Sequence, residues 1–250
     1  MPELLYPAAV VLAGYVVLGI TGFGSALVIV PLLAWHWPLP EVVALTLLLD
    51  VPASLLQGGL NLRQVNTAEL RRLLPGLIAG ALAGLWLTQV LSARWPLLVL
   101  GVYVAAVGLQ ALRAAAGPRH AAHAIRAPWA TAMGGVIGMV EMLFGTAGPL
   151  VVAWLSRRLP DVQALRATTP VVIATSACTV LLTMGASGRL SQPELWQRWC
   201  VLLGLAVAGV LLGNRLARCV SPSALRRVIC ALLVISGLCL VGQALWGGAV

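Results

Sequence analysis

The sequence predicts an all-α integral membrane protein. Hydrophobic residues make up 60% and charged residues 9% of its 250 positions, and the mean hydropathy is +0.98. Soluble domains carry about 25% charged residues. The basic residues are all arginines, and they lie between or near the ends of apolar runs. This distribution is typical of anchoring at the cytoplasmic face of a membrane, and it argues against nucleic-acid binding.

Two stretches are too long to cross a membrane as single straight helices. Residues 4–40 carry no charge, and residues 127–156 carry only Glu141. As helices they would measure about 55 Å and 45 Å, against a hydrocarbon core of about 30 Å. Glycine clusters at 19–25 and 144–149 interrupt them. Paired breaks in two halves of one chain are typical of the binding sites of transporters.

Six further apolar runs each approach the ~20 residues that a membrane-spanning helix needs. They are residues 42–62, 73–93, 95–112, 167–188, 199–214 and 228–250. Two of them carry glycines at the spacing that favours close packing of helices: Gly76, Gly80 and Gly84, and Gly204, Gly209 and Gly213. The polar segment 113–126 is the one evident linker.

The arginines indicate how the two long stretches are arranged. If each stretch crosses the membrane once, the sixteen arginines divide eight against eight. If each turns back at its glycine cluster, thirteen lie on one side, and only Arg94, Arg189 and Arg198 lie on the other. The preference for positive charge on the cytoplasmic side favours the second arrangement. It places the linker inside and both termini on the outer face.

The two halves resemble each other. Residues 23–30 match 144–151 at an offset of 121, residues 40–45 match 160–165 at an offset of 120, and Gly80 and Gly84 match Gly209 and Gly213 at an offset of 129. We therefore predict two inverted repeats, each a broken-helix hairpin followed by three transmembrane helices, at 1–113 and 127–250 with a cytoplasmic linker at 114–126. Inverted repeats are a common basis for alternating access.

Three segments resemble the TauE/SafE sulfite-exporter family, also called TSUP permeases: 22–25 with Pro31, 144–148, and 160–169. The resemblance covers nearly the whole chain. It implies a secondary transporter, expected to be an exporter in a bacterial inner membrane, for sulfite or other small sulfur oxyanions and organosulfonates. Ser25-Ala26 stands where the family commonly has a glycine pair, which leaves the choice of anion open.

A helix that restarts inside the membrane presents free N–H groups and a partial positive charge, so it binds an anion without a buried lysine. Ser25 and Thr146 hold equivalent places in the repeat, and the alternative is that both merely cap the second half-helices. We also expect Thr168 and Thr169 to bind substrate, because Pro170 frees backbone groups near them. The expected substrate-binding residues are Gly22, Phe23, Gly24, Ser25, Ala26, Gly145, Thr146, Ala147, Gly148, Thr168 and Thr169.

Two acids lie at membrane depth, Asp50 and Glu141. A charge there costs at least ~2.5 kcal/mol, so such residues are usually functional. We expect both to take part in proton coupling. The alternative is that freed backbone N–H groups satisfy each carboxyl and its role is structural.

Two other classes remain open. A passive anion channel would share the hairpins without needing the acids. The string Gly185-Ala186-Ser187-Gly188 matches a short motif of intramembrane serine hydrolases, but the histidines lie at helix ends or in the linker, away from any base that would activate the serine. We expect no enzyme activity, cofactor, metal or nucleic-acid partner. The expected partners are a small anion and the lipid bilayer, and the oligomeric state is open.

Overall fold

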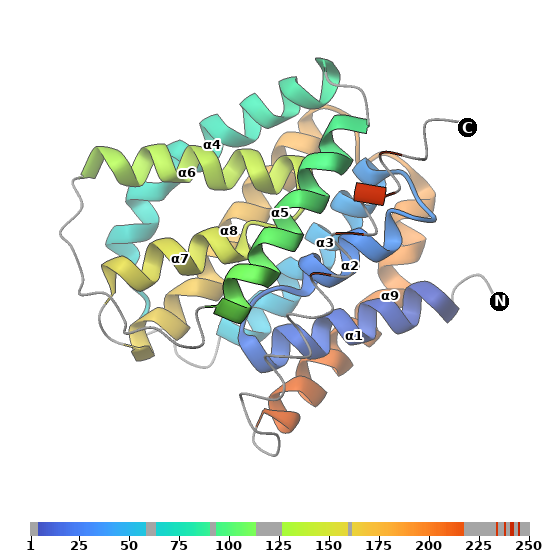
Figure 1. Cartoon of the computed structure of the whole chain (residues 1–250), viewed down its shortest axis with the longest axis horizontal. Coiled ribbons are helices and arrows are strands. Elements are labelled where there is room, and N and C mark those ends of the chain that lie inside the picture. Colours follow the sequence, from blue (N-terminus) through green and yellow to red (C-terminus); the bar gives the residue numbers. More distant parts are fainter. Residues whose placement is uncertain are drawn as a thin grey trace.

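The computed structural model describes residues 5–58, 64–90, 94–113, 127–159 and 162–217, with a few single positions beyond 217. This part of the chain is helical throughout and contains no strand (Figure 1). Its helices are α1 (Leu5–Thr21), α2 (Ser25–Leu33), α3 (Leu39–Gly58), α4 (Thr67–Val90), α5 (Arg94–Arg113), α6 (Ala127–Phe144), α7 (Gly148–Arg158), α8 (Val162–Ala186) and α9 (Pro193–Leu216).

Both long apolar stretches are broken at their glycine clusters, as the sequence predicts. The first break separates α1 from α2, and the second separates α6 from α7. Gly22, Gly24 and Gly145 have φ values of 82°, 96° and 65°. Residues with a side chain rarely adopt this left-handed region, so glycine permits the break at these three positions.

The helix after each break runs back toward the end where the chain entered. The ring of Tyr6, near the start of α1, stacks on His36 beyond α2 with centroids 4.6 Å apart, and its hydroxyl donates to the Leu32 carbonyl at 2.9 Å. In the second half, Ala130 of α6 shares a core cluster with Leu155 of α7 and with Leu159. The two broken pairs occupy opposite ends of the molecule (Figure 1).

Four helices among the described residues are long and apolar enough to cross a membrane: Leu39–Gln57, Thr67–Val90, Ala167–Ala186 and Pro193–Leu216. Helices α4 and α9 begin well before the predicted apolar runs, because their first turns are polar. Asn66 caps α4 by accepting the Glu69 amide at 3.1 Å, and Pro193 starts α9 at a position where its missing N–H costs nothing. The predicted run 228–250 and the linker 114–126 lie outside the described residues, apart from single positions.

The long helices pack in matching pairs: α4 against α6, α1 against α9, and α3 against α8. Glycines allow the close approach. A Cβ atom on Gly80 would collide with the backbone of Gly135, and one on Gly213 would lie 2.9 Å from the Gly19 Cα. Gly204 has open space around it, so the expectation of close packing is wrong at that position.

Candidate functional site

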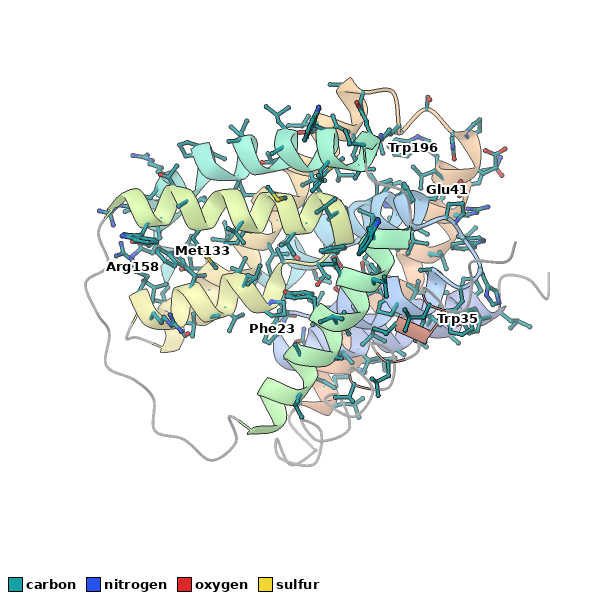
Figure 2. The ribbon with its side chains drawn as sticks, turned by 45° about the horizontal axis from the view of Figure 1, so that its top comes forward. Phe23, Trp35, Glu41, Met133, Arg158 and Trp196 are labelled. Atoms are coloured by element: carbon teal, nitrogen blue, oxygen red, sulfur yellow. The ribbon has the colours of Figure 1, made fainter. Side chains whose placement is uncertain are left out.

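The two helix breaks lie in contact with each other. A Cβ atom placed on Gly148, at the start of α7, would lie 3.4 Å from the Phe23 Cβ and 3.7 Å from the Gly24 amide nitrogen. Phe23 also packs against the core cluster that contains Ala147 and Val151. In Figure 2, Phe23 lies between Arg158 at one end of the molecule and Glu41 at the other. The loops of both halves therefore meet in the interior.

Asp50 ties the first break to its surroundings. Its Oδ1 accepts hydrogen bonds from the Ser25 and Tyr15 hydroxyls, both at 2.7 Å. Asp50 is buried, as are both of its donors. One carboxyl thus connects α1, the first residue of α2 and the middle of α3. Sequence reasoning missed Tyr15, whose only signal was a polar group within an uncharged span.

The two hydroxyls at equivalent places in the repeat differ in what they do. Neither α2 nor α7 has a side-chain cap, so the capping alternative fails for Ser25 and Thr146. The Ser25 hydroxyl donates a hydrogen bond to Asp50, whereas the buried Thr146 hydroxyl makes no hydrogen bond that is seen among the described residues. Thr146 is therefore the freer donor at the breaks.

The backbone amides of three predicted binding residues already have acceptors within the chain. The Gly145 amide donates to the Glu141 carbonyl at 2.7 Å, the Gly22 amide donates to the Leu18 carbonyl at 2.7 Å, and the Phe23 amide faces the Thr21 hydroxyl at 3.3 Å. The Gly22 and Gly145 amides close the final turns of α1 and α6, and the Phe23 amide is bound by the Thr21 side chain. The amides without an acceptor in their own helix are those of the first turn of α2 and, in α7, those of Gly148 and Leu150, because Pro149 has no N–H and the Val151 amide donates to the Ala147 carbonyl at 3.0 Å.

Glu141 lies one turn before the second break and is buried. The Ser176 hydroxyl of α8 donates to its carboxyl. Asp50 and Glu141 lie close enough for their charges to interact. Two ionised carboxylates in such a low-dielectric interior would repel each other strongly. Each carboxyl accepts hydrogen bonds from hydroxyl groups, and neither forms an ion pair with a basic side chain among the described residues.

The hydroxyls of Thr168 and Thr169 make hydrogen bonds within the protein. The Thr168 hydroxyl accepts the Asn66 amide at 3.0 Å, which joins α8 to the start of α4. The Thr169 hydroxyl donates to the Leu165 carbonyl one turn earlier at 2.8 Å, which is the ordinary bond of a helical threonine. Neither residue is shown at a break, so their predicted binding role has no contact in support.

Charged contacts lie at the two ends of the molecule. At one end, Arg158 approaches the Glu69 carboxylate at 2.5 Å, with side chains 10% and 5% exposed. At the other end, Arg198 lies 3.1 Å from Glu41, with side chains 28% and 30% exposed, and its guanidinium stacks 4.3 Å above the Trp37 ring. Figure 2 places Arg158 and Glu41 on opposite sides. The ion pair at Arg158 is therefore the more deeply buried of the two.

Sequence reasoning overlooked these end contacts, although a signal was present. Glu69 and Arg198 differ by 129 positions, as do Gly80 and Gly209, and Trp37 and Arg158 differ by 121, as do Gly24 and Gly145. In the predicted repeat, the Glu69–Arg158 contact and the Arg198–Trp37 contact therefore join equivalent positions, with the two halves exchanged.

The serine-hydrolase alternative gains no support from the geometry. The Ser187 hydroxyl donates to the Met184 carbonyl at 2.8 Å in the turn that ends α8. His36, the histidine within the described ranges, stacks on Tyr6 beyond α2. No group of three potential metal ligands occurs among the described residues.

Apolar spanning helices, two broken helices in contact and two buried acids define a polytopic membrane protein with an internal polar site. Comparison with known proteins then identifies its family. The sequence profile described as Sulfite exporter TauE/SafE matches residues 6–240, and the chain belongs to this family.

A curated relative agrees with this assignment. The chain is 46% identical over 205 residues to a protein of Comamonas testosteroni named "Probable inner membrane transporter protein TsaS", and the match covers 81% of this chain and 83% of that protein. No solved structure matches the chain. The family and this relative support a membrane transporter rather than an enzyme.

Proposed function

We propose that this protein is a secondary transporter of small anions, with sulfite or another sulfur oxyanion or organosulfonate as substrate, and that it works as an exporter by alternating access. The single observation that carries this proposal is the contact between the two helix breaks beside two buried carboxyl groups. First-turn amides and the Thr146 hydroxyl offer donors to an anion there without a buried cation. The family supplies the substrate class.

The inverted-repeat arrangement is part of the proposal. In the proposed repeat, α1, α2, α3 and α4 correspond to α6, α7, α8 and α9. The pair α4 and α6 in this way corresponds to the pair α9 and α1, and both pairs pack closely. The pair α3 and α9 likewise corresponds to the pair α8 and α4, which also pack. This correspondence supports two structurally related halves with a site at their interface. Their opposite orientation, with both termini on the outer face, is proposed from the arginine distribution.

Proton coupling follows from charge. An anion at the breaks would lie near Asp50 and Glu141, and negative charges repel strongly where water is excluded. Binding of the anion therefore favours the protonated carboxyls, so that binding of protons and binding of the anion are coupled. Affinity should fall as the pH rises, because ionised carboxylates repel the substrate. A passive channel has no such requirement.

The end contacts suggest how access alternates. The Glu69–Arg158 pair seals one end and the Arg198–Glu41–Trp37 contact lies at the other. We propose that opening of one end accompanies tightening of the other. This is the expected behaviour when equivalent parts of two repeats exchange conformations around a fixed site.

Purified protein in sealed proteoliposomes tests this function. Under an imposed pH gradient, sulfite should accumulate against its concentration gradient, and a protonophore should abolish the accumulation. A panel with thiosulfate, sulfoacetate and simple carboxylates ranks the substrates. Transport that only follows the anion gradient, whatever the pH gradient, would identify a passive channel instead.

A further inference from the structure

The hydroxyl of Tyr103 is a buried donor without a partner. Its oxygen is shielded from solvent and makes no hydrogen bond to any residue that the structure describes. Buried polar groups in proteins are nearly always paired, and an unpaired one costs stability. Phenylalanine would fill the same space without that cost. The hydroxyl therefore calls for a partner other than the residues that the structure describes, and a bound ligand is such a partner.

Tyr103 stands beside the second helix break. Its ring stacks on Phe144 with centroids 6.5 Å apart and planes inclined by 21°. Phe144 is the last residue of α6, immediately before Gly145. Helix α5, which carries Tyr103, packs against both α6 and α2. The ring is thus held where elements of both breaks come together.

The nearest recorded acid does not use this hydroxyl. Glu141 lies within range of electrostatic interaction with Tyr103, but the hydrogen bond recorded at its carboxyl comes from Ser176. Asp50 accepts from Tyr15 and Ser25. Both buried carboxyls thus accept from other hydroxyls, and the Tyr103 O–H has no acceptor among the described residues.

We propose that Tyr103 is a substrate-binding residue whose O–H donates a hydrogen bond to an oxygen of the anion at the second break. The inference rests on the transport function proposed above and extends its site to α5. A neutral donor suits this place, because a hydrogen bond to a charged oxygen is stronger than one between neutral groups. It orients the anion without adding a buried cation.

The test compares Tyr103→Phe with Tyr6→Phe in calorimetric titrations with sodium sulfite under oxygen-free conditions. Each variant removes one phenolic oxygen, and Tyr6 lies at the far end of α1, where its hydroxyl serves the Leu32 carbonyl. We expect Tyr103→Phe to weaken sulfite binding about 10- to 100-fold, and Tyr6→Phe to leave the dissociation constant unchanged. Without sulfite, Tyr103→Phe should melt at or above the wild-type temperature.

Each other outcome overturns the inference. If the wild type binds sulfite and Tyr103→Phe binds it equally well, the hydroxyl has no part in binding, while the transport function stands. If Tyr103→Phe melts well below the wild type without ligand, or if both variants lose affinity alike, the hydroxyl is structural. If the wild type binds neither sulfite nor any anion of the panel, the proposed function fails and this inference fails with it.

Discussion

Glu69 and Arg198 stand 129 positions apart, at matching places in α4 and α9, and each forms an ion pair at a different end of the molecule. Glu69 meets Arg158 in a nearly dry environment, whereas Arg198 meets Glu41 where both side chains are about one-third exposed. The difference in exposure predicts different energetic roles.

We expect Arg158→Gln to lower the free energy of unfolding by roughly 3 kcal/mol, because it leaves a buried Glu69 carboxylate with only Arg72 beside it. Arg198→Gln should cost at most about 1 kcal/mol, because its pair is solvated. Denaturant unfolding in detergent micelles measures both. The double variant Glu69→Gln with Arg158→Gln should recover part of the loss. Equal effects of the two single changes would contradict the burial of the Glu69–Arg158 pair.

Asp50→Asn tests proton coupling. Asparagine keeps an oxygen that accepts from Ser25 and Tyr15, but it does not titrate, so sulfite transport should lose much of its pH dependence. Glu194→Gln is the matched control, since Glu194 is an exposed acid in the first turn of α9. Transport rates in proteoliposomes over a pH series give the comparison. A pH profile of Asp50→Asn that overlays the wild type would remove Asp50 from the coupling mechanism.

Ser25→Ala and Thr146→Val should separate stability from binding. Ser25→Ala deletes a hydrogen bond to a buried carboxyl and should cost about 1.5–3 kcal/mol. Thr146→Val removes a hydroxyl that has no recorded bond among the described residues, so stability should hardly change while sulfite affinity drops several-fold. Thermal unfolding with and without sulfite measures both quantities. Unaltered affinity in Thr146→Val would exclude its hydroxyl from the site.

Glycine packing gives a matched pair of substitutions. Gly80→Ala places a methyl group against the Gly135 backbone and should cost about 1–3 kcal/mol. Gly204→Ala places the same group in open space and should be neutral or stabilising by up to about 1 kcal/mol, since alanine favours helix. Thermal unfolding of the two variants checks this. A comparable loss at both sites would mean that α4 does not approach α6 as described.

Accessibility labelling tests the hairpins. In a cysteine-free background, Leu5→Cys and Trp35→Cys should react with an impermeant maleimide added outside intact cells, because both residues are exposed and lie at one end. Ser156→Cys should react only after permeabilisation. Labelling of Leu5→Cys and Trp35→Cys from opposite faces would disprove the return of α2.

Much of the fold could be predicted from the sequence. Two apolar stretches longer than the bilayer is thick, each interrupted by a glycine cluster, predicted both breaks at the positions where they occur. This worked because backbone geometry is local: left-handed φ values at Gly22, Gly24 and Gly145 depend on the absence of a side chain at those positions. Helix starts were less accurate, since polar first turns carry no hydrophobic signal.

The amino-acid sequence was enough to predict a helical membrane protein, the breaks in its long helices and the two acids within its apolar stretches, because hydrophobicity, segment length and glycine content act locally. Which groups meet is seen only in the folded protein. Asp50 accepts from Ser25 and Tyr15, Thr168 bonds to the start of α4, Gly148 lies against Phe23, and the Tyr103 hydroxyl has no partner among the described residues. These relationships join residues tens of positions apart, and they depend on how whole helices pack against one another.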